Sequence, residues 1–228
     1  MILILIVFMI IGFLVSNRLK SKFKKYSKIG LQSGLSGREI AEAMLRDNGI
    51  YDVQVVSVQG HLSDHYNPAN KTVNLSPEVY QGRSASAAAV AAHECGHAVQ
   101  HATAYSFLEF RSAMVPIQNI SAKILNFVMI GMLFLGLGAQ MMNMQMILMV
   151  IVAAQFVITL FSLVTLPVEF DASKRALAWI DEKGIVTSQE HAMAKDALHW
   201  AAMTYVVAAI SAITQLLYFV MMMMGSRD

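Results

Sequence analysis

The residues best suited to chemistry form one short run, His93-Glu94-Cys95-Gly96-His97, in which a glutamate follows the first of two histidines. On a helix, residues four apart lie on one face about 6 Å apart, so both imidazoles can bind one tetrahedral Zn²⁺. Glu94 lies to one side of the pair, where it can take a proton from a metal-bound water and pass it to a leaving amine. The H-E-x-x-H pattern therefore predicts peptide hydrolysis with Glu94 as general base.

Two later residues are candidates for the third protein ligand of a catalytic zinc site. His101 continues the histidine series. At a rise of 1.5 Å per residue it stands about 12 Å along the helix from His93, so we expect it to support the site or to pack beside it. Glu169 follows a long uncharged tract. From its position alone, it is either a charge at a membrane exit or a ligand.

Other polar residues are candidates for supporting roles. Asp64, His65 and Tyr66 are expected in a polar turn, and they could also border the site. His199 and Tyr205 lie where the last apolar run begins. There they could donate a hydrogen bond to a tetrahedral oxyanion, or they could be ordinary interfacial residues.

A helix must position the motif, and the alanine-rich run from Ser84 to Ala92 has high helix propensity. Upstream, valines between positions 53 and 58 predict a strand, positions 64–71 predict a turn, and Thr72 to Leu75 predict a second strand. We expect this second strand to be the sheet edge that could hold an extended substrate.

Capping signals predict two further helices in this soluble part. Ser36 and Glu39 form a capping box, and Gly49 stands where that helix should end. Ser76 followed by Pro77 is typical of a helix start. The segment between the first and second apolar runs is therefore expected to be mixed α/β.

The composition excludes an ordinary soluble protein. Hydrophobic residues make up 56% of the chain and charged residues 14%, against about 25% charged residues in a typical soluble domain. The tract from Ile124 to Val168 has no charge and is long enough for two spans of ~20 residues, with a turn expected at Gly136, Gly138, Gln140, Asn143 and Gln145. A last span is expected from Ala201 to Met224.

A basic cluster follows the first apolar run: Arg18, Lys20, Lys22, Lys24, Lys25 and Lys28. Its position is typical of the cytoplasmic flank of a membrane helix and not of nucleic-acid binding. This orientation places the soluble part and the segment after the third span in the cytoplasm, with Asp228 outside. The single cysteine, Cys95, excludes an internal disulfide and is expected to be a buried apolar residue.

Three stretches together resemble the YugP-type zinc-dependent membrane peptidases of bacteria: 61–68 (HLSDHYNP), 91–100 (AAHECGHAVQ) and 166–173 (LPVEFDAS). The resemblance covers nearly the whole chain. More distantly, the chain is similar to the HtpX-type and CAAX-prenyl membrane proteases. These are gluzincins, whose third ligand is a glutamate on a later helix.

The resemblance implies His93, His97 and Glu169 as zinc ligands and Glu94 as the base. Ser173 stands where the gluzincin pattern has an aspartate. The carboxylate that usually lies behind a ligand histidine is therefore expected to be replaced by another group, with Asp171, His101 and Asp64 as the alternatives.

We therefore expect a multi-pass α-helical membrane protein with about four transmembrane helices and a small zincin-like α+β catalytic part. The expected segments are an N-terminal anchor (1–17), a cytoplasmic α+β part with the H-E-x-x-H helix (18–115), a transmembrane hairpin (116–168), cytoplasmic helices with the third zinc ligand (169–200), and a last span with its tail (201–228).

The expected function is that of an integral zinc metalloendopeptidase in the bacterial plasma membrane, acting near the cytoplasmic surface on peptides or membrane proteins. The alternative is a non-catalytic zinc-containing scaffold or chaperone-like partner. Structural zinc sites normally have four protein ligands and no positioned base, so Glu94 favours the enzyme. A zinc sensor or transporter is disfavoured because the spans lack intramembrane charges. Oligomerisation and a regulatory membrane partner stay open.

Overall fold

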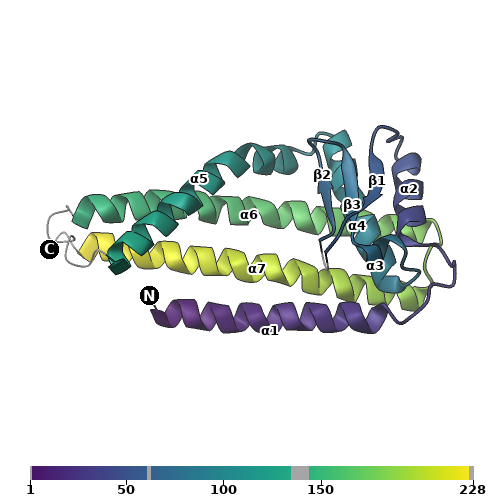
Figure 1. Ribbon diagram of the computed structural model, residues 1–228, viewed down its shortest axis with the longest axis horizontal. Helices are drawn as coiled ribbons and strands as arrows, with labels where there is room; N and C mark the ends of the chain where they lie inside the picture. Colours follow the sequence, from purple (N-terminus) through teal and green to yellow (C-terminus); the bar gives the residue numbers. More distant parts are fainter. Residues whose placement is uncertain (1, 61–62, 135–143, 226–228) are drawn as a thin grey trace. The chain divides into compact units, whose positions relative to one another are not determined.

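The computed structural model describes residues 2–60, 63–134 and 144–225 (Figure 1). In chain order the elements are α1 (Ile2–Tyr26), α2 (Gly37–Asp47), β1 (Gln54–Ser57), β2 (His65–Asn67), β3 (Thr72–Leu75), α3 (Pro77–Tyr80), α4 (Ala85–Ala102), α5 (Ser106–Phe134), α6 (Met144–Glu182) and α7 (Ser188–Gly225). The chain forms two compact units. We call them the span unit (Met1–Phe13, Phe110–Leu166, Tyr205–Asp228) and the head unit (Leu14–Glu109, Pro167–Thr204).

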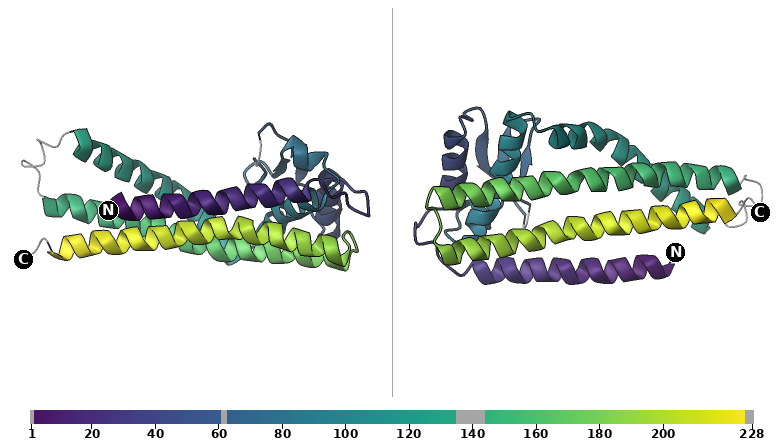
Figure 2. Two further views of the ribbon diagram at one scale, coloured as in Figure 1. Left: turned by 90° about the horizontal axis from the view of Figure 1, so that it is seen from below. Right: turned by 180° about the vertical axis from the view of Figure 1, so that it is seen from behind.

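Within the described ranges, α1, α5, α6 and α7 are long and apolar enough to cross a membrane. Their number agrees with the sequence-based expectation, and the chain is a helical membrane protein with a small α+β part. Figure 2 shows that α6 and α7 are each one continuous helix, so the spans and parts of the head unit share the same helices. Of the turn predicted between the second and third spans, positions 136–143 lie outside the described residues, whereas Gln145, also assigned to that turn, lies in the first turn of α6. Asp228 and positions 61–62 of the first family-like stretch lie outside the described residues as well.

Inside the span unit, α6 and α7 are joined by hydrogen bonds from buried polar side chains. Gln155 Nε2 and Thr159 Oγ1 on α6 donate to the carbonyl oxygen of Ala212 on α7, at 3.2 and 3.1 Å. In an apolar environment such donors need a partner, so these bonds join the two spans.

The head unit contains a three-stranded sheet in the order β1-β3-β2. β3 pairs in parallel with β1 and antiparallel with β2. The expectation that Thr72–Leu75 forms a sheet edge was therefore wrong, because this strand is central. The predicted turn at 64–71 was too long, since His65–Asn67 form a strand that folds back on β3 through a turn with Lys71 at φ 53°.

The other local predictions agree with the structure. The capping box of Ser36 and Glu39 begins α2, and Gly49, with φ 70°, follows its C-cap. In the core of the head unit, α4 packs against α2, α3 and the sheet, with most of its alanines fully buried. These small side chains allow close packing around the helix that carries the motif.

Candidate metal centre

Helix α4 presents the two motif histidines side by side. The helix begins after Ser84, whose hydroxyl accepts a hydrogen bond from the Ala87 backbone N–H, and it continues to Ala102. The rings of His93 and His97 lie 4.8 Å apart, centroid to centroid, at 81° to each other. They are 12% and 10% exposed as side chains, so both imidazoles are largely shielded from water.

Helix α6 approaches α4 closely at one glycine. A Cβ atom at Gly96 would lie 2.6 Å from the carbonyl oxygen of Ala172, closer than real contacts allow. The backbones can therefore meet here only because position 96 has no side chain. This contact brings the start of the head-unit part of α6, including Glu169, beside the histidines.

The Glu169 carboxylate lies at the histidine pair. Its Oε2 is 3.3 Å from Nε2 of His93 and 3.7 Å from Nε2 of His97, and the residue is 3% exposed. Zinc bonds of about 2.0–2.2 Å in a tetrahedral arrangement place ligand atoms about 3.3 Å apart. In the part of the chain that the structure describes, these three residues form the one group of this kind, with ligand atoms within 4.8 Å of one another. Their spacing and chemistry fit zinc.

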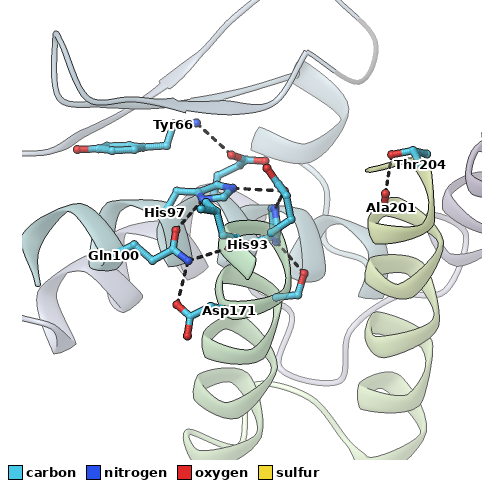
Figure 3. Close-up of polar contacts among 11 residues, drawn as sticks. Tyr66, His93, His97, Gln100, Asp171, Ala201 and Thr204 are labelled. Carbon is cyan, nitrogen blue, oxygen red and sulfur yellow. Dashed lines mark hydrogen bonds and ion pairs between the residues drawn. The ribbon is translucent and has the colours of Figure 1, made fainter. Parts of the chain in front are cut away.

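Gln100, one turn after His97, determines which nitrogen of that histidine carries the proton. Gln100 Nε2 donates to the carbonyl oxygen of Val168 at 2.8 Å and to Asp171 Oδ2 at 2.9 Å. These two acceptors orient the amide, so its Oε1, 3.0 Å from His97 Nδ1, must accept a hydrogen bond (Figure 3). His97 is therefore protonated at Nδ1, which leaves Nε2, on the side of Glu169, as the nitrogen available to a metal.

His93 has a different supporting partner. Its Nδ1 lies 3.1 Å from Ser173 Oγ on α6. Ser173, which stands where the sequence resemblance led us to expect an aspartate, thus lies beside a motif histidine, and its hydroxyl can either donate or accept. Asp171 acts on the other histidine and only through Gln100. The Asp171 carboxylate is in turn bonded to Arg175 at 2.6 Å.

The other two alternatives for a supporting carboxylate have different partners. Asp64 accepts hydrogen bonds from the backbone N–H and hydroxyl of Ser76, and burial raises the pKa of its carboxyl. His101 Nδ1 bonds to the Tyr66 hydroxyl at 2.7 Å. Among the described contacts, neither residue bonds to His93 or His97.

Glu94 belongs to the motif but points to the sheet. It is 8% exposed, and its Oε2 accepts the backbone N–H of Tyr66 at 3.0 Å. Tyr66 pairs with Val73 of β3, yet its N–H is directed away from β3 and toward α4. One carboxylate oxygen of Glu94 is therefore held by the β2 edge.

The charge distribution favours a cation. Burial lowers the pKa of His97, but the nearby Glu169 carboxylate and the charge of Glu94 outweigh it, so the pKa is raised overall. Two carboxylates thus stabilise positive charge at the His97 imidazole, and a divalent ion placed beside it would receive the same stabilisation.

The remaining sequence candidates lie elsewhere. His65 Nδ1 bonds to the carbonyl oxygen of Ser63, His199 lines a cavity between α6 and α7, and Tyr205 belongs to the span unit. Cys95 is fully buried as expected, and burial raises the pKa of its thiol. Sequence reasoning missed Gln100. Its position three residues after His97, on the same helix face, is the signal that could have identified it.

The fold and this site define a class, the helical membrane proteins in which two histidines and a glutamate form a cluster that could hold a metal ion. Within that class, the chain belongs to the family described as "Putative neutral zinc metallopeptidase", whose model matches residues 1–224. Over 218 residues it is 41% identical to "Putative membrane protease YugP" of Bacillus subtilis (strain 168), covering 96% of this chain and 94% of that protein. The resemblance found in the sequence is thereby confirmed. No solved structure matches the chain.

Proposed function

We propose that the chain is an integral-membrane zinc metalloendopeptidase, with His93, His97 and Glu169 as zinc ligands and Glu94 as general base. The observation that carries the proposal is the position of Glu169 Oε2, within 3.3 and 3.7 Å of the two Nε2 atoms. Glu94 lies outside this ligand set, as a base should. Two histidines, a carboxylate and an open position form an established catalytic set.

Glu94 has the surroundings that proton transfer requires. Zinc, when bound, polarises the scissile carbonyl and lowers the pKa of a coordinated water to about 7. The Tyr66 N–H holds Oε2 of Glu94, which leaves Oε1 to take the proton from the attacking water. The same oxygen then delivers that proton to the amine that leaves when the peptide C–N bond breaks.

The β2 edge is the candidate surface for an extended substrate. In an antiparallel pair, alternate residues direct both N–H and C=O away from the partner strand. Since the Tyr66 N–H is directed away from β3, its carbonyl shares that direction and can accept a substrate N–H. A peptide added along β2 would pass beside Glu94.

We also propose partners and a location for the protein. The substrate is a peptide or a membrane protein, the lipid bilayer holds the spans, and nucleic acid plays no part. We place the protein in the plasma membrane with the site facing the cytoplasm, because the basic residues of α1 after Ser16 fit an inner flank.

Glu94→Gln tests the proposal against a non-catalytic zinc scaffold. Glutamine keeps the size of the side chain and can still accept the Tyr66 N–H, but it cannot take up a proton. The purified variant should retain about one zinc per chain by metal analysis and lose nearly all peptidase activity in a peptide-library digest. Zinc retention with unchanged activity in Glu94→Gln would reject the mechanism. The alternative predicts no zinc-dependent cleavage by either protein.

A further inference from the structure

The cavity lined by His199 lies in the head unit, open to the surface between α6 and α7. Its volume is about 480 Å³, and its wall includes Ser173, the residue that bonds His93 Nδ1. That nitrogen is on the opposite side of the ring from the Nε2 that faces Glu169. The cavity therefore lies behind a metal ligand, away from the position where a scissile bond would bind.

The cavity wall is basic. Lys174 on α6 and Lys195, His191 and His199 on α7 line it, and Asp181 is its one acidic residue. Among the described residues neither lysine is paired with a carboxylate, whereas Asp171 and Asp196 are already bonded to Arg175 and Lys22. The two free ammonium groups favour an anion, and the histidines add donors for its oxygens.

Polarity changes along the cavity. Because α6 and α7 are antiparallel, Phe170 and Ala202 mark one end, and Asp181 and His191 mark the other, near the connecting loop. Lys174 and Lys195 stand between the two ends. Beyond Phe170 and Ala202, both helices continue into their apolar runs, and Phe170 itself is 45% exposed. An anionic head group with an apolar tail fits this order.

We propose that this cavity binds an anionic phospholipid, with its phosphate between Lys174 and Lys195 and its acyl chains leaving past Phe170 and Ala202. Basic pockets between membrane helices are suited to such head groups, and each lysine near a membrane surface adds a modest electrostatic attraction. The site is independent of the proposed peptidase activity. A lipid bound there would lie next to Ser173, whose hydroxyl contacts Nδ1 of His93.

The test uses the delipidated full-length protein in neutral detergent, titrated with dioleoyl phosphatidylglycerol and followed by native mass spectrometry. One tightly bound lipid per chain is expected, with much weaker binding of dioleoyl phosphatidylcholine. Removing both charges in a Lys174→Gln, Lys195→Gln variant should weaken the phosphatidylglycerol affinity about 30-fold. The matched control is Lys24→Gln, Lys28→Gln, which removes two charges from the basic cluster of α1 and should leave the affinity nearly unchanged.

A second variant removes space instead of charge. Ala178→Trp places a large ring in the cavity from an exposed position on its wall, and it should abolish tight lipid binding while zinc content stays normal. Three outcomes would overturn the proposal: equal losses in the two double variants, equal binding of both lipids, or unchanged lipid binding in Ala178→Trp. Full displacement of the lipid by millimolar inorganic phosphate would also reject it in favour of a free-anion site.

Discussion

Nδ1 of His97 lies 3.0 Å from Oε1 of Gln100, so a neutral amide supports this histidine from behind. A carboxylate at that place would draw the imidazole proton and make the ring a stronger electron donor to the metal. On the Nδ1 side of the ring, the carboxylate of Asp171 does not contact His97 and acts only by orienting the Gln100 amide. The tautomer of His97 is therefore set by a neutral group on the Nδ1 side of its ring.

Replacing Gln100 with leucine should weaken zinc binding by about 10–100-fold, because His97 loses the acceptor that fixes its tautomer. The measurement is zinc affinity by chelator competition, with thermal unfolding recorded for the same samples. Ser173→Ala should reduce zinc affinity less, because the Ser173 hydroxyl can donate or accept and so does not fix the tautomer of His93. Equal affinity of Gln100→Leu and the parent protein would contradict this role.

Removing the Glu169 carboxylate should weaken zinc binding more than removing any group that supports a histidine. Glu169→Ala is expected to lower zinc affinity by more than about 100-fold, beyond the usual effect of losing a residue behind a ligand. Asp171→Ala and His101→Ala are the matched controls and should retain the metal with, at most, reduced turnover. Metal analysis after dialysis distinguishes these cases. Normal zinc content in purified Glu169→Ala would remove Glu169 from the ligand set.

Gly96→Ala should loosen the site without touching a ligand. The added methyl would lie 2.6 Å from the carbonyl oxygen of Ala172, so α4 and α6 must separate slightly. Such overpacking typically costs about 1–3 kcal/mol, and the separation moves Glu169 away from the histidines. A lower melting temperature and weaker zinc binding are expected. Gly131→Ala, with no atom within 4 Å of the new Cβ, is the control and should change neither. Normal zinc affinity in Gly96→Ala would show that this contact does not position Glu169.

The orientation in the membrane can be tested with single cysteines on a Cys95→Ser background. The basic cluster after the first span predicts that the head unit is cytoplasmic. In intact cells, Gln140→Cys should then react with an impermeant maleimide, whereas Glu182→Cys should react only after permeabilisation. The reverse labelling pattern would invert the topology and leave the chemistry unaffected.

Features that depend on residues adjacent in the sequence could be predicted, whereas features that depend on residues far apart in the chain could not. The capping box at Ser36 and the motif helix depend on neighbouring residues, so a pattern was enough to predict them. The role of Gln100 depends on Val168 and Asp171, which α6 brings from far along the chain. β2 has only three residues and is defined by its pairing with β3, so its sequence resembled a turn. The ligand set stays a prediction until metal binding is measured.

The contact between His93 and Ser173 joins positions 80 residues apart in the chain, and α5 and most of α6 lie between them. At about 5–20 residues per second, a ribosome needs on the order of ten seconds to synthesise that stretch. On the proposed ligand set, the nascent chain therefore presents its H-E-x-x-H helix well before Glu169 exists. The order of synthesis would delay completion of the centre until two further spans have been made. On that ligand set, an incomplete nascent chain would lack Glu169 and could not hydrolyse nearby proteins.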